Sequence, residues 1–397
     1  MLLALGLLLL GGVLAGQVCS GVGLPRVVGY VLAGVVFSEG LLGRWLGVEI
    51  GPWSGPVATA SLGIVAYLIG GAVTPGQLRR IGKIVFSAAV AGTVVPTVTV
   101  CLGLWALGAR VEGVSSLHLA LVLGAIAATT APAATMAVIH QYRASGLFTR
   151  ALLGVVAVDD AIGLMIYSLI LAVGLGGSLS DTVWVATGEI IGGLLVGAVA
   201  GYVLARASRW VRLNGLRLCL VLGGLLWVTA IAQQMHFSPL LAAMCMGFVC
   251  RAMHGSSGEG LFAPIEYLEE VTFVLFFTLA GLHFQAEAFV AHAGIVAAYI
   301  VLRAAGKIGG GALGAAVGQA PMAYRKWLGF GLLPQAGVAV GLVLSLSGHP
   351  VFKGAETAVV NIVLASTIVH ELVGPIATRF ALSMAGELGA KRMGKQT

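Results

Sequence analysis

The chain has 397 residues, of which 59% are hydrophobic and only 9% are charged, whereas a soluble domain carries about 25% charged residues. So few charges cannot cover a water-facing surface, which excludes a soluble enzyme, a disordered regulator and a nucleic-acid-binding protein. The net charge is +7, and the 59 glycines are typical of helices that pack closely in a membrane. The composition therefore predicts a polytopic membrane protein.

Apolar runs follow one another along the whole chain, and a membrane-spanning helix needs about 20 mostly apolar residues. Thirteen runs approach or meet this length: 1–18, 26–43, 56–77, 84–108, 116–139, 147–175, 182–205, 214–234, 237–253, 267–284, 288–317, 327–347 and 357–381. None alternates as a barrel strand would, so we predict an all-helical bundle with about 13 transmembrane helices. The first run lacks the basic start of a signal peptide, and we expect it to be retained.

The loops between these runs predict the orientation of the chain. Of the 22 Lys and Arg residues, 17 fall in the odd-numbered loops and the tail, three in the even-numbered loops and two within a run. Because basic loops stay in the cytoplasm, the N-terminus is predicted outside and the C-terminus inside. We expect a prokaryotic cytoplasmic (inner) membrane, with residues 386–397 as a short cytoplasmic tail.

Two adjacent acids lie in the middle of the run 147–175. A charge at bilayer depth costs about 2.5–3.5 kcal/mol, so Asp159 and Asp160 are candidates for a functional site. Neighbouring residues on a helix point about 100° apart, so the two carboxylates do not easily share one partner. One of them can bind a cation while the other pairs with a fixed positive charge. The alternative is a structural pair that is buried against another helix.

The fixed charge is available in the run 288–317, where Lys307 lies near the middle and Arg303 one turn earlier. A buried lysine can release its proton when its counter-ion is disturbed, so Lys307 is predicted to be an ion-pair and proton-release partner. Like charges four residues apart repel, and each base is therefore expected to need its own acid. For Arg303 we favour a structural role over a functional one.

Other embedded acids are weaker candidates. Glu371, beside His370 in the last run, is a secondary candidate for the site, and Glu189 is expected to face a cavity or a packed interface. Three more glutamates cluster at the predicted cytoplasmic end of a run: Glu266, Glu269 and Glu270. They could form an acidic funnel for cations, but we favour a solvated helix end.

Two of the apolar runs are interrupted. Pro132 and Pro334 each stand near the centre of a run, where a proline removes a backbone hydrogen bond. Interrupted spans at corresponding places in two halves of a chain point to a transporter site, although simple kinks are the alternative. Thr129 and Thr130 add hydroxyl oxygens that suit a hard cation, and Gln335 follows the second proline.

The order of these features resembles a known family. A broken helix, a helix with Asp159-Asp160, a helix with Lys307 and a second broken helix resemble the monovalent cation:proton antiporter 2 family and its NapA-type sodium/proton antiporters. The segments Leu24–Gly34 and Leu275–Leu282 extend the likeness. Gln335 stands in a segment where many relatives have a basic residue and an acid, which leaves the ion selectivity open.

The resemblance implies inverted repeats with two crossed broken helices, an elevator-type movement and a homodimer. It gives Asp160 the role of binding cation and proton in turn, and it gives Asp159 the role of pairing with Lys307. It also implies a single transmembrane unit over 1–385, with the core (transport) domain mainly in 84–175 and 288–381 and the dimerisation domain mainly in 1–77 and 182–253.

The sequence thus predicts a secondary antiporter that exchanges Na+ or Li+ for H+ and serves pH homeostasis, with Na+ bound at Asp160. Exchange is electrogenic if Lys307 also releases a proton. A K+/H+ antiporter and a sodium-coupled symporter of an organic anion are the alternatives. An intramembrane aspartyl protease needs two acids on different helices, which the adjacent pair does not provide. We expect no enzymatic activity, no cofactor and no nucleic-acid partner.

Overall fold

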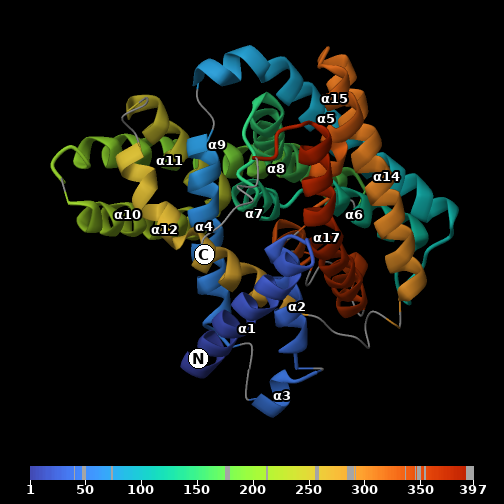
Figure 1. Cartoon of the computed structure of the whole chain (residues 1–397). Coiled ribbons are helices and arrows are strands. Elements are labelled where there is room, and N and C mark those ends of the chain that lie inside the picture. Colours follow the sequence, from blue (N-terminus) through green and yellow to red (C-terminus); the bar gives the residue numbers. More distant parts are fainter. Residues whose placement is uncertain are drawn as a thin grey trace.

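The computed structural model describes residues 1–39, 41–46, 51–72, 75–174, 179–211, 213–254, 259–283, 290, 292–335, 337–344, 346, 350–352 and 355–389. Within these residues every regular element is a helix, apart from one isolated bridge between Val111 and Val114 (Figure 1). Of the predicted tail, residues 390–397 lie outside the described residues. The predicted all-helical class is confirmed for the described part of the chain.

The helices follow the apolar runs of the sequence. In chain order they are α1 (Leu2–Gly21), α2 (Arg26–Val36), α3 (Gly43–Leu46), α4 (Ser54–Ala72), α5 (Pro75–Ala106), α6 (Ser116–Ala127), α7 (Pro132–Gln141), α8 (Leu147–Gly174), α9 (Leu179–Ala207), α10 (Asn214–Gln234), α11 (Pro239–His254), α12 (Glu259–Leu282), α14 (Ala293–Val317), α15 (Met322–Trp327), the 3-10 helix η2 (Leu328–Leu332), α16 (Gly337–Leu344), the 3-10 helix η3 (Pro350–Phe352) and α17 (Glu356–Met384).

Each predicted run overlaps a helix or a pair of helices, with differences at the ends. The run 26–43 holds a helix only as far as Val36, and α12 begins at Glu259 rather than at 267. Nine helical segments of the described residues are long and apolar enough to cross a membrane, by length and composition. The number of spans therefore stays a prediction.

The helices pack in two groups. We call α5–α8 and α14–α17 the core group, in which α5 packs along α14 and α17 packs on η2. We call α1–α4 and α9–α12 the scaffold group, in which α11 packs on α4 and α9, and α12 packs on α1, α2 and α4. Figure 1 shows α10, α11 and α12 on one side of the molecule and α5, α6, α14 and α15 on the other. Whether the groups move relative to one another stays a prediction.

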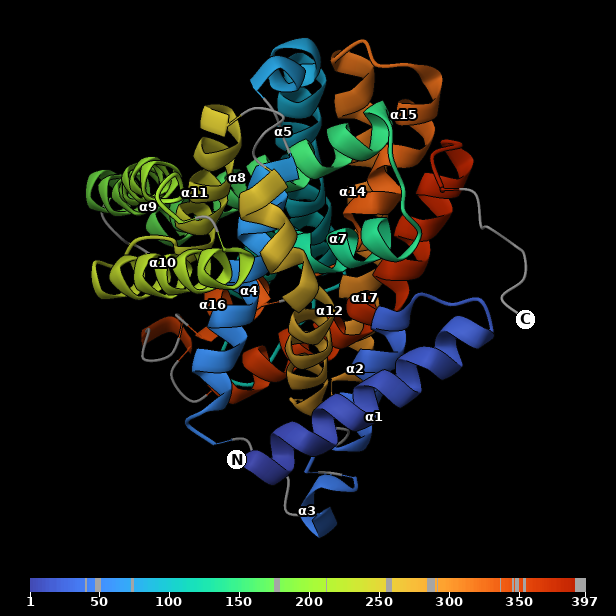
Figure 2. The same ribbon diagram turned by 60° about the vertical axis from the view of Figure 1, so that its left-hand side comes forward.

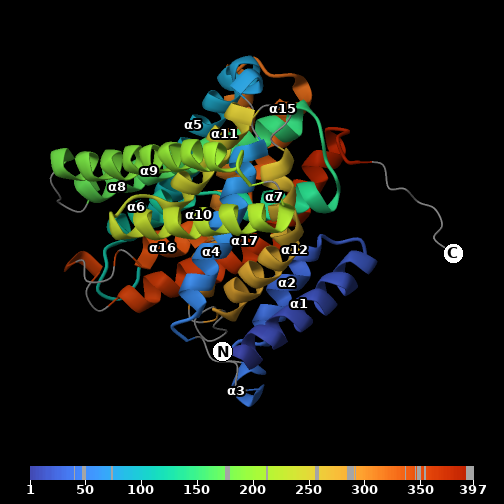
Figure 3. The same cartoon turned by 90° about the vertical axis from the view of Figure 1, so that its left-hand side faces the viewer.

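Contacts between the groups run mainly through α8 with α9, α2 with α17, and α4 and α2 with α7. Figure 3 shows α8, α9 and α10 extending side by side, and Figure 2 shows α1 crossing one end of the molecule close to α2. The polar residues discussed below lie inside the core group and along its contact with the scaffold group.

Glycines hold the core group together at close range. Gly306, Gly310 and Gly314 repeat every four residues on one face of α14, and a Cβ atom on any of them would collide with the backbone of α5. In a membrane no hydrophobic force drives helices together, because lipid tails are as apolar as the side chains. Small residues instead let helix backbones approach closely and pack against each other. This contact fixes α14, and with it Arg303 and Lys307, against α5.

The outer faces of the helices are apolar. On α9, Trp184, Leu195 and Val199 each expose more than half of their surface. A water-facing protein seldom exposes a large continuous apolar surface, but a surface that faces lipid hydrocarbon requires one. This agrees with an integral membrane protein.

Candidate ion-binding site

The chain is interrupted at both prolines rather than merely bent. The helix α6 ends at Ala127 and α7 begins at Pro132, while η2 ends at Leu332 and α16 begins at Gly337. The two breaks touch: the amide of Ala131 donates to the carbonyl of Pro334 at 2.9 Å. We call this contact region the crossing.

Side chains tie the two breaks further together. The Gln335 amide donates to the carbonyl of Ile126 at 3.2 Å and to the Tyr299 hydroxyl at 2.9 Å. The Thr135 hydroxyl donates to the carbonyl of Gly331 at 3.3 Å. Gln335 therefore has a defined place in the crossing, where it links the second break to the end of α6 and to α14. Nothing in the sequence pattern marked Tyr299, because a tyrosine in an apolar helix is common.

Arg303 binds the carbonyl groups that the breaks leave free. Its guanidinium donates to Thr129 at 2.6 Å, to Leu333 at 2.7 Å and to Pro334 at 3.4 Å, and the side chain is fully buried. We expected an acid as its partner, and this expectation is wrong. The last carbonyls of a helix lack intrahelical donors and carry the negative end of its dipole, so two interrupted helices can hold a guanidinium without a carboxylate.

Lys307 pairs with Asp159, the partner that the family resemblance implied. Its ammonium lies 3.0 Å from Asp159 Oδ2 and 2.8 Å from the Thr130 hydroxyl, and it also donates to the carbonyl of Ala128. The Thr130 hydroxyl in turn donates to Asp159. An ammonium has three hydrogens to donate, and here each has an acceptor. Both charges of the pair are fully buried and mutually neutralised.

Asp160 stands in contrast to its neighbour. Its side chain is 1% exposed, and neither carboxylate oxygen has a hydrogen-bond partner among the described residues. Gly163, three residues later and on the same side of α8, faces Thr129 of the first break. The Thr129 hydroxyl donates to the carbonyl of Ile126 at 3.0 Å, which leaves its oxygen lone pairs available. Because an unpaired buried carboxylate is strongly disfavoured, Asp160 requires a proton or a cation.

The secondary candidates Glu371 and Glu189 lie in different surroundings. Glu371 of α17 is fully buried, and neither of its carboxylate oxygens has a partner among the described residues. Its neighbour His370 packs edge-on against Tyr299, with 6.2 Å between the ring centres. Glu189 is half-buried on α9 in the scaffold group, outside the crossing.

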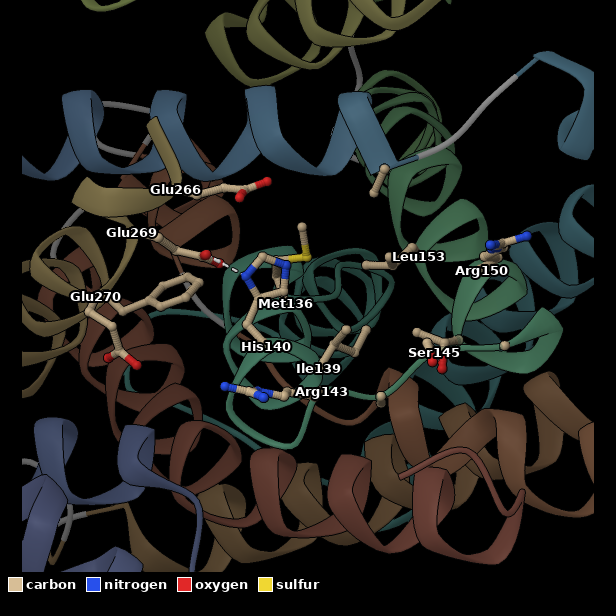
Figure 4. Close-up of a pocket in the computed structure, with 15 residues that line it drawn as sticks. Met136, Ile139, His140, Arg143, Ser145, Arg150, Leu153, Glu266, Glu269 and Glu270 are labelled. Carbon is tan, nitrogen blue, oxygen red and sulfur yellow. Dashed lines mark hydrogen bonds and ion pairs between the residues drawn. The ribbon is translucent and has the colours of Figure 1, made fainter. Parts of the chain in front are cut away.

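A cavity of about 570 Å³ lies where α7, α8 and α12 meet, and we call it the vestibule (Figure 4). Its lining includes Met136, His140, Arg143, Arg150, Leu153, Glu266, Glu269, Glu270 and Phe273. Leu153 precedes Asp160 by seven residues on α8, which corresponds to about 10 Å along the helix. The vestibule therefore reaches α8 about two turns before the unpaired carboxylate of Asp160.

The three glutamates of α12 do not behave alike. Glu266 and Glu270 are exposed, but α12 begins about two turns earlier, so they do not form its end, and Glu270 binds Arg26 and Tyr30. Glu269 is only 6% exposed and binds His140 Nδ1 (Figure 4). The expectation of a solvated helix end is therefore wrong, most plainly for Glu269, whose carboxylate binds His140 at the end of α7. His140 and Glu269 are 129 positions apart, so the sequence carried no signal for this contact between the core and scaffold groups.

An interrupted pair of helices around a buried carboxylate, with a lysine opposite, defines a membrane transporter for small ions. Two solved structures of the sodium proton antiporter MjNhaP1 from Methanocaldococcus jannaschii share this fold. The structure at pH 8 has a TM-score of 0.69 and covers 97% of each chain. The structure from electron microscopy has a TM-score of 0.74 and covers 99% of this chain and 97% of the other. Both are 18% identical to this chain.

The family follows from the sequence match. Residues 5–383 match the family model described as "Sodium/hydrogen exchanger, transmembrane". The chain belongs to this family, which confirms the resemblance to sodium/proton antiporters at the level of the family. A search of curated proteins gave no match.

Proposed function

We propose that the protein is a secondary antiporter that exchanges a monovalent cation, Na+ or Li+, for protons at Asp160. Its membership of the sodium/hydrogen exchanger family supports this class of activity. One observation carries the assignment to Asp160: it is a fully buried carboxylate without a partner among the described residues, beside an aspartate that a lysine already neutralises.

The proposed exchange depends on competition for one carboxylate. With Asp159 neutralised by Lys307, the site around Asp160 has a single negative charge to offset. Either a dehydrated cation or a proton can supply the compensating positive charge, but the two cannot occupy the site together. The Asp160 carboxylate thus loses its proton before it takes the cation, and the next proton displaces the cation on the other side of the membrane.

Lys307 has a second proposed role. If cation binding draws Asp159 away from Lys307, the ammonium loses its counter-ion and releases a proton. More than one proton then moves per cation, and exchange is electrogenic and driven by the membrane potential.

The movement is proposed to be of the elevator type. The core group (mainly 84–175 and 288–381) would carry the ion past the scaffold group (mainly 1–77 and 182–253), through which the chain would form a homodimer. The proposed setting is the cytoplasmic (inner) membrane of a prokaryote, with about 13 spans in inverted repeats, the N-terminus outside and the C-terminus inside. The vestibule would then give the cation access to Asp160 in this conformation.

The experiment uses proteoliposomes with a pH gradient, in which the addition of Na+, Li+ or K+ dissipates the gradient, with and without an imposed voltage. Asp160→Asn is expected to abolish cation-dependent proton flux. The matched control is Asp181→Asn, which changes the one aspartate of the chain that lies outside the adjacent pair Asp159 and Asp160. Full flux in the Asp160→Asn variant would refute the assignment.

A further inference from the structure

A stripe of unpaired oxygen atoms runs along one face of α17. Thr367, Glu371 and Thr378 are spaced by four and seven residues, so they lie on the same side of the helix. All three side chains are buried, and neither hydroxyl nor either carboxylate oxygen has a hydrogen-bond partner among the described residues. Polar spacing of this kind in an apolar helix was visible in the sequence, but only the fold shows that it is buried.

The backbone adds another free oxygen at the same place. Pro375 follows Glu371 by four residues inside α17, and a proline has no N–H to donate to the carbonyl four residues before it. Buried polar atoms without protein partners are the usual sites of ordered water. Each of these oxygen atoms is therefore suited to bind an ordered water molecule.

The stripe borders the crossing. A Cβ atom on Gly374, which lies between Glu371 and Thr378 on the same face, would collide with the backbone of Pro334. His370 packs against Tyr299, the residue that accepts a hydrogen bond from Gln335. Glu371 thus sits beside the second break, within the same core group as Asp160.

The charges of the core group do not balance without Glu371. Among its described residues, the fully buried Lys, Arg, Asp and Glu side chains are Arg303, Lys307, Asp159, Asp160 and Glu371. Two bases face three acids, so without a cation the two unpaired acids, Asp160 and Glu371, must hold one proton between them for the buried charges to cancel. Glu371 has no ion-pair partner in the described part of the chain, whereas Asp159 is paired with Lys307. Burial of an uncompensated charge is strongly unfavourable.

We propose that Glu371 is a second proton-binding site, whose proton leaves when a cation occupies Asp160. The cation then balances the third carboxylate, and the departing proton passes along the Thr367–Thr378 stripe to solvent. A proton, unlike a hydrated cation, can pass along hydroxyls and ordered water molecules. This inference rests on the proposed function: the one proton that charge balance requires is shared by Asp160 and Glu371, and it leaves from Glu371 when Asp160 takes the cation.

The route to solvent can be traced in the direction of Thr378. Arg379, the next residue, lies with its guanidinium 5.0 Å from the ring centre of Tyr142, and Arg143 lines the vestibule. The C-terminal part of the stripe therefore lies beside the end of α7, and Arg143, which follows that end, lines the vestibule. A proton from Glu371 and a cation for Asp160 would use the same end of the molecule in this conformation.

The test measures protons released when Na+ is added to the purified protein in weakly buffered detergent solution with a pH indicator. Glu371→Gln is expected to release one proton fewer per bound Na+ than the unmodified protein and to bind Na+ with unchanged stoichiometry. In an infrared difference spectrum induced by Na+, one carboxyl C=O band should disappear in this variant. Glu189→Gln, the same change at a half-buried glutamate of the scaffold group, is the matched control.

Two results would overturn the proposal. The first is unchanged proton release with an unchanged carboxyl band. The second is the loss of one bound Na+ in the Glu371→Gln variant, which would make Glu371 a cation site instead. If Glu371→Gln does not fold, the double variant Thr367→Val with Thr378→Val is tested instead. It should slow proton release at least several-fold without changing Na+ affinity. Unaltered release kinetics would then refute the role of the stripe as the path of the proton. Failure of the antiport function itself is recognised separately, since Asp160→Asn alone reports on it.

Discussion

The neighbours Asp159 and Asp160 occupy the same helix and the same depth of the core group, yet the fold treats them in opposite ways. Asp159 accepts from Lys307 and Thr130, whereas Asp160 has no partner among the described residues. A paired buried charge is fixed, because removal of its partner is strongly unfavourable. An unpaired one can exchange its ligand. The contrast separates structural charges from exchangeable ones within a single site.

The same contrast extends to the bases and acids of other helices. Arg303 is held by three carbonyl groups of the two breaks, while Glu371 on α17 has no partner in the described part of the chain. In this conformation the cations of α14 are thus the paired elements that hold the crossing, and two of the three buried carboxylates of the core group are free to gain or lose a proton.

The largest effect is expected where a fixed charge loses its partner. Asp159→Asn leaves Lys307 buried without a counter-ion and should lower the free energy of unfolding by about 3–5 kcal/mol. The double variant Asp159→Asn with Lys307→Met removes both charges and should recover most of this loss. Thermal unfolding in detergent measures the effect.

Asp160→Asn is the matched control for that experiment, because it makes the same chemical change at the adjacent residue. Since Asp160 has no partner to lose, its substitution should leave the unfolding temperature unchanged or raise it. Equal destabilisation by the two substitutions would show that the aspartates are equivalent and would remove the distinction.

A smaller effect is expected at Arg303. Arg303→Gln removes the charge and most of the hydrogen bonds to the break carbonyls, and hydrogen bonds to charged groups contribute about 1.5–3 kcal/mol each. Arg303→Lys keeps the charge but cannot reach carbonyls of both breaks at once. Both variants should unfold at lower temperature, and Arg303→Lys should raise the KM for the cation more than it lowers kcat. If Arg303→Lys is indistinguishable from the unmodified protein, the geometry of the guanidinium is unimportant.

The smallest effect concerns the contact between the two helix groups. His140→Gln or Glu269→Gln removes the charge of one partner but keeps a side chain that can hydrogen-bond, so the loss should be about the 0.5–1.5 kcal/mol of one hydrogen bond. Unfolding should therefore change little. If the core group moves past the scaffold group, however, this contact must break, and the exchange rate in proteoliposomes should change. Glu266→Gln, an exposed acid of the same vestibule, is the control, and equal rates in all three variants would show that the contact does not limit movement.

The sequence determined the class of this protein and the chemical nature of its site. Thirteen apolar runs are visible without a fold, because lipid requires every spanning segment to be apolar and to bond its own backbone. Asp159, Asp160 and Lys307 were visible for the same reason, since a charge in an apolar run is expensive and therefore conspicuous. Pro132 and Pro334 marked the breaks, because a proline must leave a helical hydrogen bond unmade.

Only the tertiary structure decided which of these polar groups are paired. Arg303 binds carbonyl groups rather than an acid because two helix ends meet in front of it, and Glu269 is buried where it binds His140 of α7. The pairing of Asp159 rather than Asp160 with Lys307 was implied only by resemblance and is a matter of how α8 and α14 are placed. Such pairings join residues that lie far apart in the chain, and their distances are set by helix packing, which no local pattern of residues encodes.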